Sequence, residues 1–355
     1  MSPIGVFEIF YGLPWSKESR FAYADFMKNH GFDFYIYGPK ADAQLRKHWF
    51  ERIPETDRKY YVELCKHFKS RGLQFGMALG PQGLQEGMNL VKRNQLIDKI
   101  KSLSDLGIDI LGLFFDDMKS AEGLAEHQLE IMQLVQQSTD AKIVFCPSFY
   151  SEDPLLDMLF GDRPENYLET IGKNLDSKIE ILWTGESVIS KEISATHLEK
   201  VSQVLKRKPF ICDNFYANDG PANCQFLKLV PPDGRSVAAL SESCAWGMNP
   251  MNQAALSQVV LAAYSHVIRK KMNPNEAYQQ ALKEFCSADS RHYFLLNSIR
   301  FAEDGIDSVS PDEKLKYRQS VGPNPTEIER EVIQWMDGNY TVDFSVVIDQ
   351  SGYSE

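Results

Sequence analysis

The stretch Ile110-Leu111-Gly112-Leu113-Phe114-Phe115-Asp116-Asp117 is an apolar run that ends in two adjacent carboxylates. Short apolar runs of this kind are typical of parallel strands that are buried on both faces. The preceding segment, Leu90–Leu106, has apolar residues at helical spacing, and Gly107 stands where the C-terminus of that helix is expected. The stretch therefore predicts a helix followed by a buried parallel strand with polar side chains at its carboxyl end.

The same alternation of short apolar segments and longer amphipathic ones continues along most of the chain. A second helix, Lys59–Arg71, is followed by Gly72 in the same way. Eight such units favour a TIM (β/α)8 barrel over a doubly wound open sheet, because no GxGxxG follows any strand and polar residues gather at the strand carboxyl ends. The predicted strands are Val6–Tyr11, Phe32–Tyr37, Gln74–Leu79, Ile110–Phe115, Lys142–Cys146, Glu180–Trp183, Pro209–Cys212 and Val237–Leu240.

The chain beyond the eighth predicted strand has a different pattern. A helix is expected from about Asn252 to Lys271, and Pro274 marks a boundary after it. We therefore predict a catalytic barrel over residues 1–272 and a small C-terminal helical region, 273–355, packed on the barrel. Within that region the expected helices are Asn275–Phe285, Pro311–Gln319 and Thr326–Met336, followed by a polar tail.

Composition and charge exclude several classes of function. The 355 residues carry a formal net charge of −11 with acidic and basic residues interspersed, which disfavours nucleic-acid binding. The six cysteines form no CxxC pair, so neither a zinc cage nor a disulfide framework is expected. No basic segment with an apolar run opens the chain and no apolar run reaches membrane-spanning length, which predicts a cytoplasmic protein without membrane association.

The Asp116–Asp117 pair suggests acid–base chemistry at the barrel mouth. Two carboxylates held close together disfavour double ionisation, which keeps one of them protonated beside an ionised partner. An acid beside a base is the combination that cleavage of a glycosidic bond requires. The alternative interpretation is structural, with the pair capping a helix that begins near Ser120.

Polar and aromatic residues also follow the other predicted strands. The first strand leads through Ile9 and Tyr11 to an aromatic lip suited to a sugar ring, or to an aromatic core cluster. Each remaining candidate has an ordinary structural alternative, such as a solvated lysine, a core tyrosine, an Asx turn or a helix cap. Their concentration at successive strand ends favours a binding site. These candidates are Lys40, Tyr150, Asn214, Asp219 and Asn249, whereas Asn252 is interpreted as the cap of the following helix.

Taken in order, these segments resemble glycoside hydrolase family 84, the family of protein O-GlcNAcases and related bacterial β-N-acetylglucosaminidases. The resemblance extends from about Gly5 to Asn252, which is essentially the whole predicted barrel. Seven ordered motifs carry it, and each alone would be ambiguous. They are FYGLPW (10–15), YGPK (37–40), FFDD (114–117), CPSFY (146–150), LWTG (182–185), DNFYAND (213–219) and MNPMNQA (248–254).

The resemblance implies a retaining, substrate-assisted mechanism in which the 2-acetamido oxygen of the sugar forms an oxazoline intermediate. By position, Asp116 matches the residue that orients the acetamido N–H, and Asp117 matches the general acid and base. Tyr150 matches a tyrosine that hydrogen-bonds in the acetamido pocket. No metal or organic cofactor is implied. The residues that match sugar ligands are Lys40, Asn214, Asn249 and Asp219, the last expected on the outer hydroxyls.

Three positions depart from the family pattern. Ile9 stands where the family usually has glycine, beside the sugar in the first-strand lip. Cys212 replaces a tryptophan in the wall of the acetamido pocket, and Phe149 stands where an acidic residue is common. Our hypothesis is that Cys212 permits a larger N-acyl group.

Two further interpretations stay open beside an exo-β-N-acetylglucosaminidase that acts on glycoproteins or free glycans. One is a related glycosidase with altered sugar or N-acyl specificity, suggested by Ile9 and Cys212. The other is a catalytically weak carbohydrate-binding barrel, which the intact Asp116–Asp117 pair and Tyr150 argue against. The sequence leaves the natural aglycone and the oligomeric state open.

Overall fold

The computed structural model describes residues 1–84, 87–116 and 118–351, and it contains a closed barrel of eight parallel strands in sequence order. The barrel closes where β1 pairs with β8, with Ile4 beside Trp246 and Val6 beside Met248. This confirms the predicted (β/α)8 barrel. The strands are β1 (Ile4–Glu8), β2 (Phe34–Tyr37), β3 (Gln74–Leu79), β4 (Ile110–Phe114), β5 (Lys142–Cys146), β6 (Glu180–Trp183), β7 (Phe210–Asp213) and β8 (Ala245–Met248).

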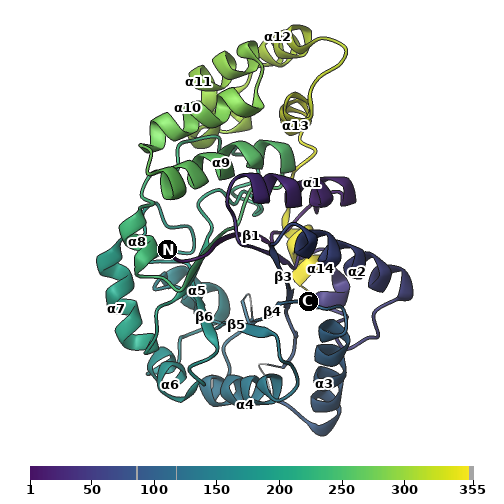
Figure 1. The fold of residues 1–355 in the computed structure, drawn as a ribbon, viewed down its shortest axis with the longest axis vertical. Helices are drawn as coiled ribbons and strands as arrows, with labels where there is room; N and C mark the ends of the chain where they lie inside the picture. The colour runs from purple at the N-terminus through teal and green to yellow at the C-terminus, as the bar shows by residue number, and fades with distance from the viewer. Residues whose placement is uncertain (85–86, 117, 352–355) are drawn as a thin grey trace.

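Helices surround the strands and continue beyond them as a C-terminal extension (Figure 1). Many begin at a side chain that accepts a backbone N–H, such as Ser16, Asn89 and Ser194. The barrel helices are α1 (Lys17–Asn29), α2 (Glu55–Ser70), α3 (Leu90–Ser104), α4 (Leu124–Gln136), α5 (Pro154–Phe160), α6 (Tyr167–Asn174), α7 (Ala195–Leu205), α8 (Val237–Ser241) and α9 (Ala254–Lys270). The later helices are α10 (Pro274–Phe285), α11 (Ala288–Glu303), α12 (Pro311–Val321), α13 (Glu327–Met336) and α14 (Phe344–Ser351), with short 3-10 helices η1 (Ala43–Leu45) and η2 (Ile306–Ser308).

Seven strands lie where the sequence predicts them, with ends that differ by at most three residues, but the eighth prediction was wrong. The apolar run Val237–Leu240 belongs to helix α8, and β8 lies further along the chain. The side chain of Ser236 accepts the Ala239 N–H at 3.1 Å and so caps this helix. The true strand, Ala245–Met248, is buried throughout, whereas Val237 is only half-buried.

Two helices end next to glycines, as the sequence predicts, whereas the start of α9 differs from the prediction. Gly72 and Gly107 follow α2 and α3 with φ of +79° and +83°, a conformation that glycine adopts without strain. The helix expected at Asn252 begins instead at Ala254. Asn252 does not cap it, because its amide Nδ2 donates to the Tyr11 carbonyl oxygen at 2.7 Å.

Phenylalanine rings fill the interior of the barrel. Phe7, Phe34 and Phe210 pack with ring centroids 5.2 to 6.1 Å apart, and Phe114 lies 6.3 Å from Phe7. The neighbouring strand residue Gly5 makes room for this packing, since a Cβ atom there would come within 2.3 Å of the Phe34 ring. Tight packing of this kind fixes the strands, and therefore the positions of the side chains at their carboxyl ends.

The C-terminal helices extend to one side of the barrel, beyond α9 (Figure 1). We propose a domain boundary between α9 and α10, at residues 272 and 273. The sequence did not predict the last helix, α14, which covers residues 344–351 and returns to the barrel. There the Gln350 side chain accepts the Gly12 N–H at 2.8 Å and donates to the Gly12 carbonyl oxygen at 3.1 Å.

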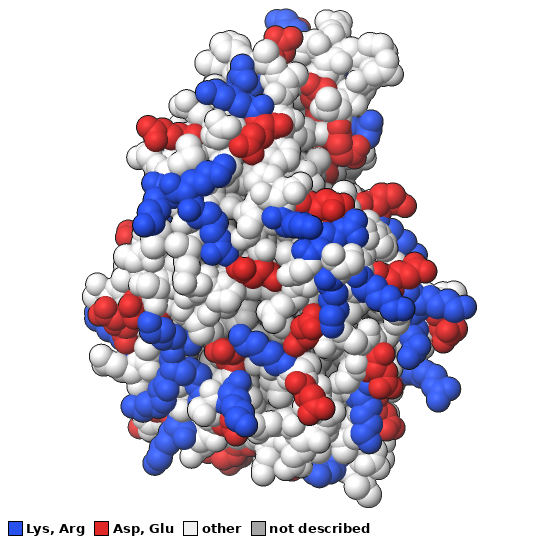
Figure 2. All heavy atoms as spheres, in the orientation of Figure 1, with Lys and Arg blue, Asp and Glu red and all other residues white. Residues whose placement is uncertain are grey.

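Acidic and basic side chains are interspersed over the face shown in Figure 2, as the sequence indicates. Within the described part of the chain, none of the helices has the length and apolar character needed to span a membrane.

Candidate active site

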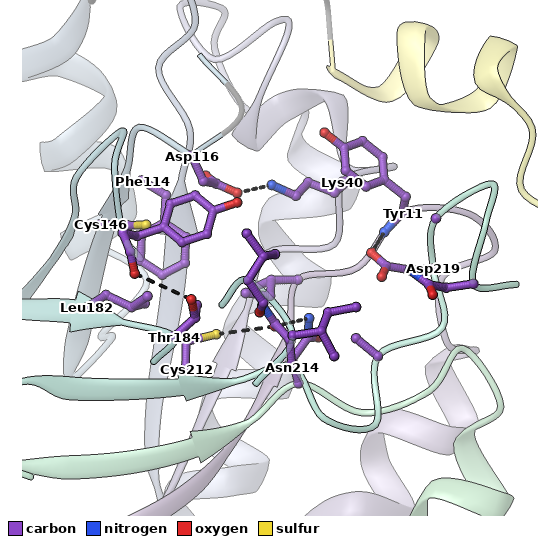
Figure 3. A pocket seen from close by; sticks show the side chains of 18 residues that line it. Tyr11, Lys40, Phe114, Asp116, Cys146, Leu182, Thr184, Cys212, Asn214 and Asp219 are labelled. Carbon is purple, nitrogen blue, oxygen red and sulfur yellow. Dashed lines mark hydrogen bonds and ion pairs between the residues drawn. The ribbon is translucent and has the colours of Figure 1, made fainter. Parts of the chain in front are cut away.

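A pocket opens among the carboxyl ends of the strands, and residues from β1, β2, β4, β5, β6, β7 and β8 or their following loops line it (Figure 3). This is the end of a (β/α)8 barrel where active sites form. Nine of the ten residues predicted from the sequence line this one pocket. They are Ile9, Tyr11, Lys40, Asp116, Tyr150, Cys212, Asn214, Asp219 and Asn249. The tenth, Asp117, lies outside the described residues.

Asp116 is the buried carboxylate of the pocket, with 8 % of its surface exposed. Its Oδ2 accepts a charged hydrogen bond from the Lys40 ammonium group, and Arg46 Nη1 lies 3.8 Å from Oδ1. Oδ1 is buried and accepts no hydrogen bond from the residues that the structure describes. The carboxylate therefore has two cations beside it and one oxygen without a hydrogen-bond donor among the described residues. The alternative role as a helix cap is excluded, because α4 begins only at Leu124 after Gly123.

Asp219 joins the loop after β7 to the aromatic lip after β1. Its Oδ2 accepts the Tyr11 N–H at 2.8 Å, which fixes the backbone of the lip (Figure 3). The ammonium group of Lys40 lies 5.2 Å from the centre of the Tyr11 ring, a cation–π contact. The lip, Lys40 and Asp116 thus form one connected side of the pocket.

The opposite wall combines amide groups with a thiol. Asn249 Nδ2 donates to Asn214 Oδ1 at 2.9 Å, and Asn214 Nδ2 donates to the Val188 carbonyl oxygen at 2.9 Å. The Cys212 Sγ lies 3.9 Å from Asn214 Oδ1. Burial, followed by the charge of Asp213, raises the pKa of the Cys212 thiol well above its usual value. Cys212 is therefore a neutral wall residue rather than a thiolate nucleophile.

The end of β5 contributes Tyr150, which lines the pocket and is 8 % exposed. The backbone N–H of Thr184, at the end of β6, donates to the Tyr150 carbonyl oxygen at 3.0 Å and holds the two loops together. Phe149 is fully buried and packs edge-on against Tyr167 with ring centroids 5.4 Å apart. The phenylalanine that departs from the family pattern therefore serves the packing behind Tyr150.

Asp213, the first residue of the DNFYAND motif (213–219), has a structural role. It accepts two hydrogen bonds from the Arg235 guanidinium, at 2.8 and 2.7 Å, and one from Trp246 Nε1 at 3.0 Å. Neither ionic side chain is more than 1 % exposed. This buried pair anchors the end of β7 and thereby the position of Asn214.

Sequence reasoning missed several residues of the pocket. Arg46 lies in the loop after β2 with no motif to distinguish it, although it is buried next to Asp116. Thr184 belongs to the LWTG motif (182–185) but was not predicted to line the pocket; its place at the end of β6 was the available signal. The apolar lining was also not anticipated. It includes Phe114, Cys146, Leu182, Val188, Ile189 and Ala217.

Comparison with known proteins places the chain in a family. The family model for beta-N-acetylglucosaminidase matches residues 4–297, which include the entire barrel. The chain belongs to the β-N-acetylglucosaminidase family. Its members are glycoside hydrolases, which confirms the resemblance to glycoside hydrolase family 84.

Two curated members of the family are similar to most of this chain. The protein O-GlcNAcase of Rattus norvegicus is 28 % identical over 315 residues, and that of Mus musculus is 28 % identical over 316 residues. Each match covers 85 % of this chain but 33 % of the relative, so the chain spans about a third of the length of these proteins.

A solved structure gives the same fold. It is a mutant of the Thermobaculum terrenum O-GlcNAc hydrolase, with a TM-score of 0.77 and 23 % sequence identity. The superposition covers 94 % of this chain and 80 % of that one. At this identity the likeness supports the fold alone, a barrel with C-terminal helices.

Proposed function

We propose that this protein is a retaining, substrate-assisted exo-β-N-acetylglucosaminidase that hydrolyses terminal β-linked N-acetylglucosamine. The observation that carries the proposal is the state of Asp116. One of its oxygens is paired with Lys40, and the other is buried in the pocket without a hydrogen-bond donor among the described residues. A buried acceptor without a partner is costly, and an N–H group of a bound ligand would satisfy it.

In the proposed reaction, Asp116 Oδ1 accepts the N–H of the 2-acetamido group and orients the acetamido oxygen towards the anomeric carbon. That oxygen forms a bond to the carbon while the bond to the leaving oxygen breaks. Asp117, which lies outside the described residues, gives its proton to the leaving oxygen. The product of this step is an oxazolinium ion, the N-protonated oxazoline, whose N–H stays hydrogen-bonded to Asp116, and the negative charge of Asp116 stabilises the positive charge of this ion.

Hydrolysis of the oxazoline reverses these movements. The Asp117 carboxylate takes a proton from water as the water oxygen bonds to the anomeric carbon, and the acetamido group is restored. Two displacements at the same carbon retain the β configuration. Lys40 keeps Asp116 in place throughout, because the ion pair holds a buried carboxylate that would otherwise be uncompensated.

The remaining polar groups of the pocket provide sugar recognition. Tyr150 and Asp219 both line the pocket; in this proposal Tyr150 hydrogen-bonds to the acetamido group, and Asp219, which holds the lip, binds the outer hydroxyls. Asn249 Oδ1 is buried and accepts no hydrogen bond from the described residues, so it is available to a hydroxyl group. Asn214 holds the Asn249 amide, and Ile9 adds an apolar contact. Sites that pair with substrate polar groups reject sugars that lack them.

The natural substrate in this proposal is a glycan or glycoprotein that carries terminal β-linked N-acetylglucosamine. The names of the two mammalian relatives support a substrate of this class. Residues that bind the aglycone would lie on the loops around the pocket.

The nucleophile can be tested with aryl β-glucosaminides that carry N-acetyl, N-fluoroacetyl and N-trifluoroacetyl groups. Fluorine withdraws electrons from the acetamido oxygen, so kcat/KM should fall steeply along the series if that oxygen is the nucleophile. The first product seen by proton NMR should be the β anomer. Rates independent of fluorination would indicate a carboxylate nucleophile, and an initial α anomer would indicate inversion; either result would overturn the mechanism.

A further inference from the structure

Outside the pocket, two histidines and a glutamate meet where α1, α9 and α10 pack together. Glu284 Oε2 lies 3.2 Å from His30 Nε2, and Glu284 Oε1 lies 3.4 Å from His266 Nε2. Within residues 1–84, 87–116 and 118–351, this is the one group of three or more His, Cys, Asp and Glu side chains with ligand atoms all within 4.8 Å of one another.

The topology places this cluster away from the active-site pocket. Helix α1 runs from the carboxyl end of β1 to the amino end of β2, and His30 directly follows its last residue, Asn29. His30 therefore lies towards the amino ends of the strands, the end of the barrel opposite to the pocket. Glu284 belongs to α10, the first helix of the C-terminal extension, which packs along α9 (Figure 1).

The orientation of the His30 ring indicates a ligand at its other nitrogen. Its Nδ1 lies 2.9 Å from the Phe26 carbonyl oxygen, which can only accept, so this nitrogen carries a hydrogen. In the neutral ring, Nε2 then presents a lone pair to the Glu284 carboxylate. Metal-binding histidines characteristically donate their second N–H to a backbone carbonyl in this way. The Nε2 lone pair and the Glu284 carboxylate repel each other, and a cation bound between them attracts both.

The spacing of the ligand atoms fits a tetrahedral metal ion. Zinc binds imidazole nitrogen and carboxylate oxygen at about 2.0–2.2 Å, so two ligands on one tetrahedral ion lie about 3.4 Å apart. The two nitrogen–oxygen distances in this cluster are 3.2 and 3.4 Å, each to a different oxygen of the Glu284 carboxylate, and the three ligand atoms lie within 4.8 Å of one another. The side chains of His30 and Glu284 are 15 % and 28 % exposed, so an ion can reach the cluster from solvent.

We propose that His30, His266 and Glu284 bind one Zn²⁺ ion, with water as the fourth ligand. The ion connects α1 and α9 of the barrel to α10 of the C-terminal extension. Because His30 lies far in the sequence from His266 and Glu284, the site exists only in the folded chain, and zinc binding stabilises the native state.

The proposal is tested on the whole chain after treatment with EDTA and its removal. Calorimetric titration with Zn²⁺ should show one equivalent bound, and Tm should rise with increasing Zn²⁺ but not with Mg²⁺. Titration with Co²⁺ should give the visible absorption of four-coordinate cobalt, which requires no variant. Glu284→Gln preserves the shape of the side chain and should weaken Zn²⁺ binding at least about tenfold. His30→Gln should do the same.

A matched control is His48→Gln. His48 forms an ordinary exposed pair with Glu51, with side chains 44 % and 49 % exposed, and its replacement should leave Zn²⁺ binding unchanged. Absence of stoichiometric Zn²⁺ binding by the unaltered chain would overturn the proposal. So would unchanged binding in both Glu284→Gln and His30→Gln. In either case the cluster would be a hydrogen-bonded triad that needs no metal.

Discussion

The Lys40 ammonium group pairs with Oδ2 of Asp116, although 76 positions separate the two residues in the chain. Lys40 follows β2 and Asp116 follows β4, so the barrel brings them together across the end of β3. The pair commits one carboxylate oxygen to Lys40, and the other is buried near Arg46 without a hydrogen-bond donor among the described residues. The proposed function rests on this division of roles between the two oxygens.

Replacing Lys40 by methionine should lower kcat/KM for an aryl β-N-acetylglucosaminide by about two orders of magnitude, because a broken buried pair leaves a charge uncompensated. Arg46 alone would then face Asp116. Lys40→Arg keeps the charge and should retain more activity. A Lys40→Met enzyme with normal kcat/KM and normal Tm would show that the ion pair has no part in the reaction.

Cys212 should control the length of the N-acyl group that the pocket accepts. Tryptophan at this position would fill space beside Asn214, which lies within 3.9 Å of the thiol. With substrates carrying N-acetyl, N-propionyl and N-butyryl groups, rates should fall less steeply with acyl length in the unaltered enzyme than in Cys212→Trp. Equal steepness in both enzymes would refute this role for Cys212. Comparable Tm values would be the control for folding.

The buried pair between Arg235 and Asp213 should contribute to stability. Asp213→Asn removes one charge of a pair that is almost inaccessible to solvent and should lower the free energy of unfolding by about 3–5 kcal/mol. Glu242→Gln is a suitable control, because the Lys208–Glu242 pair is much more exposed and should contribute about 1 kcal/mol or less. Urea titration measures both. Equal effects would contradict the structural role given to Asp213.

Stability should decline as the pH rises from about 4.5 to about 7 because of Glu331. Its carboxylate accepts the N–H groups of Ala255 and Leu256 at the start of α9, at 3.0 and 2.8 Å. Burial nevertheless raises the pKa of Glu331 from its usual 4.5 to about 7. The folded state therefore holds a proton that the unfolded state has lost, and stability falls between about pH 4.5 and pH 7, by about 3 kcal/mol at most.

Glu331→Gln removes this titration and should flatten the dependence of Tm on pH over the same interval. The comparison uses the difference between the two Tm profiles, which cancels the contributions of other groups. A constant difference from pH 4.5 to pH 8 would contradict the assignment to Glu331.

The fold was largely predictable from the sequence, because a buried parallel strand is a short apolar run and its boundaries carry turn residues. Each failure has an identifiable physical cause. The segment Val237–Leu240 is as apolar as a strand. Its helical structure is marked by the capping hydrogen bond from the Ala239 N–H to the Ser236 side chain. The segment that forms α14 is held partly by contacts with Gly12, so its helix depends on partners far away in the sequence.

Membership of the pocket was predictable for residues that follow a strand within a motif, such as Asp116 and Tyr150. Contacts between loops were not. Nothing near Arg46 indicates that it lies 3.8 Å from Asp116, because that distance depends on how the loop after β2 folds across the barrel. The hydrogen bond from the Tyr11 N–H to Asp219 likewise joins opposite ends of the barrel sequence.

The most direct test of the central claim is hydrolysis of β-N-acetylglucosaminides by the unaltered enzyme, Asp116→Asn and Asp117→Asn, with an activated aryl leaving group and with a poor one. Loss of a proton-transfer group typically costs about two to four orders of magnitude in rate. Asp117→Asn should spare the activated substrate, which needs little protonation, whereas Asp116→Asn should impair both substrates. Binding of N-acetylglucosamine without turnover by the unaltered enzyme, or Asp116→Asn with undiminished kcat/KM, would contradict the account.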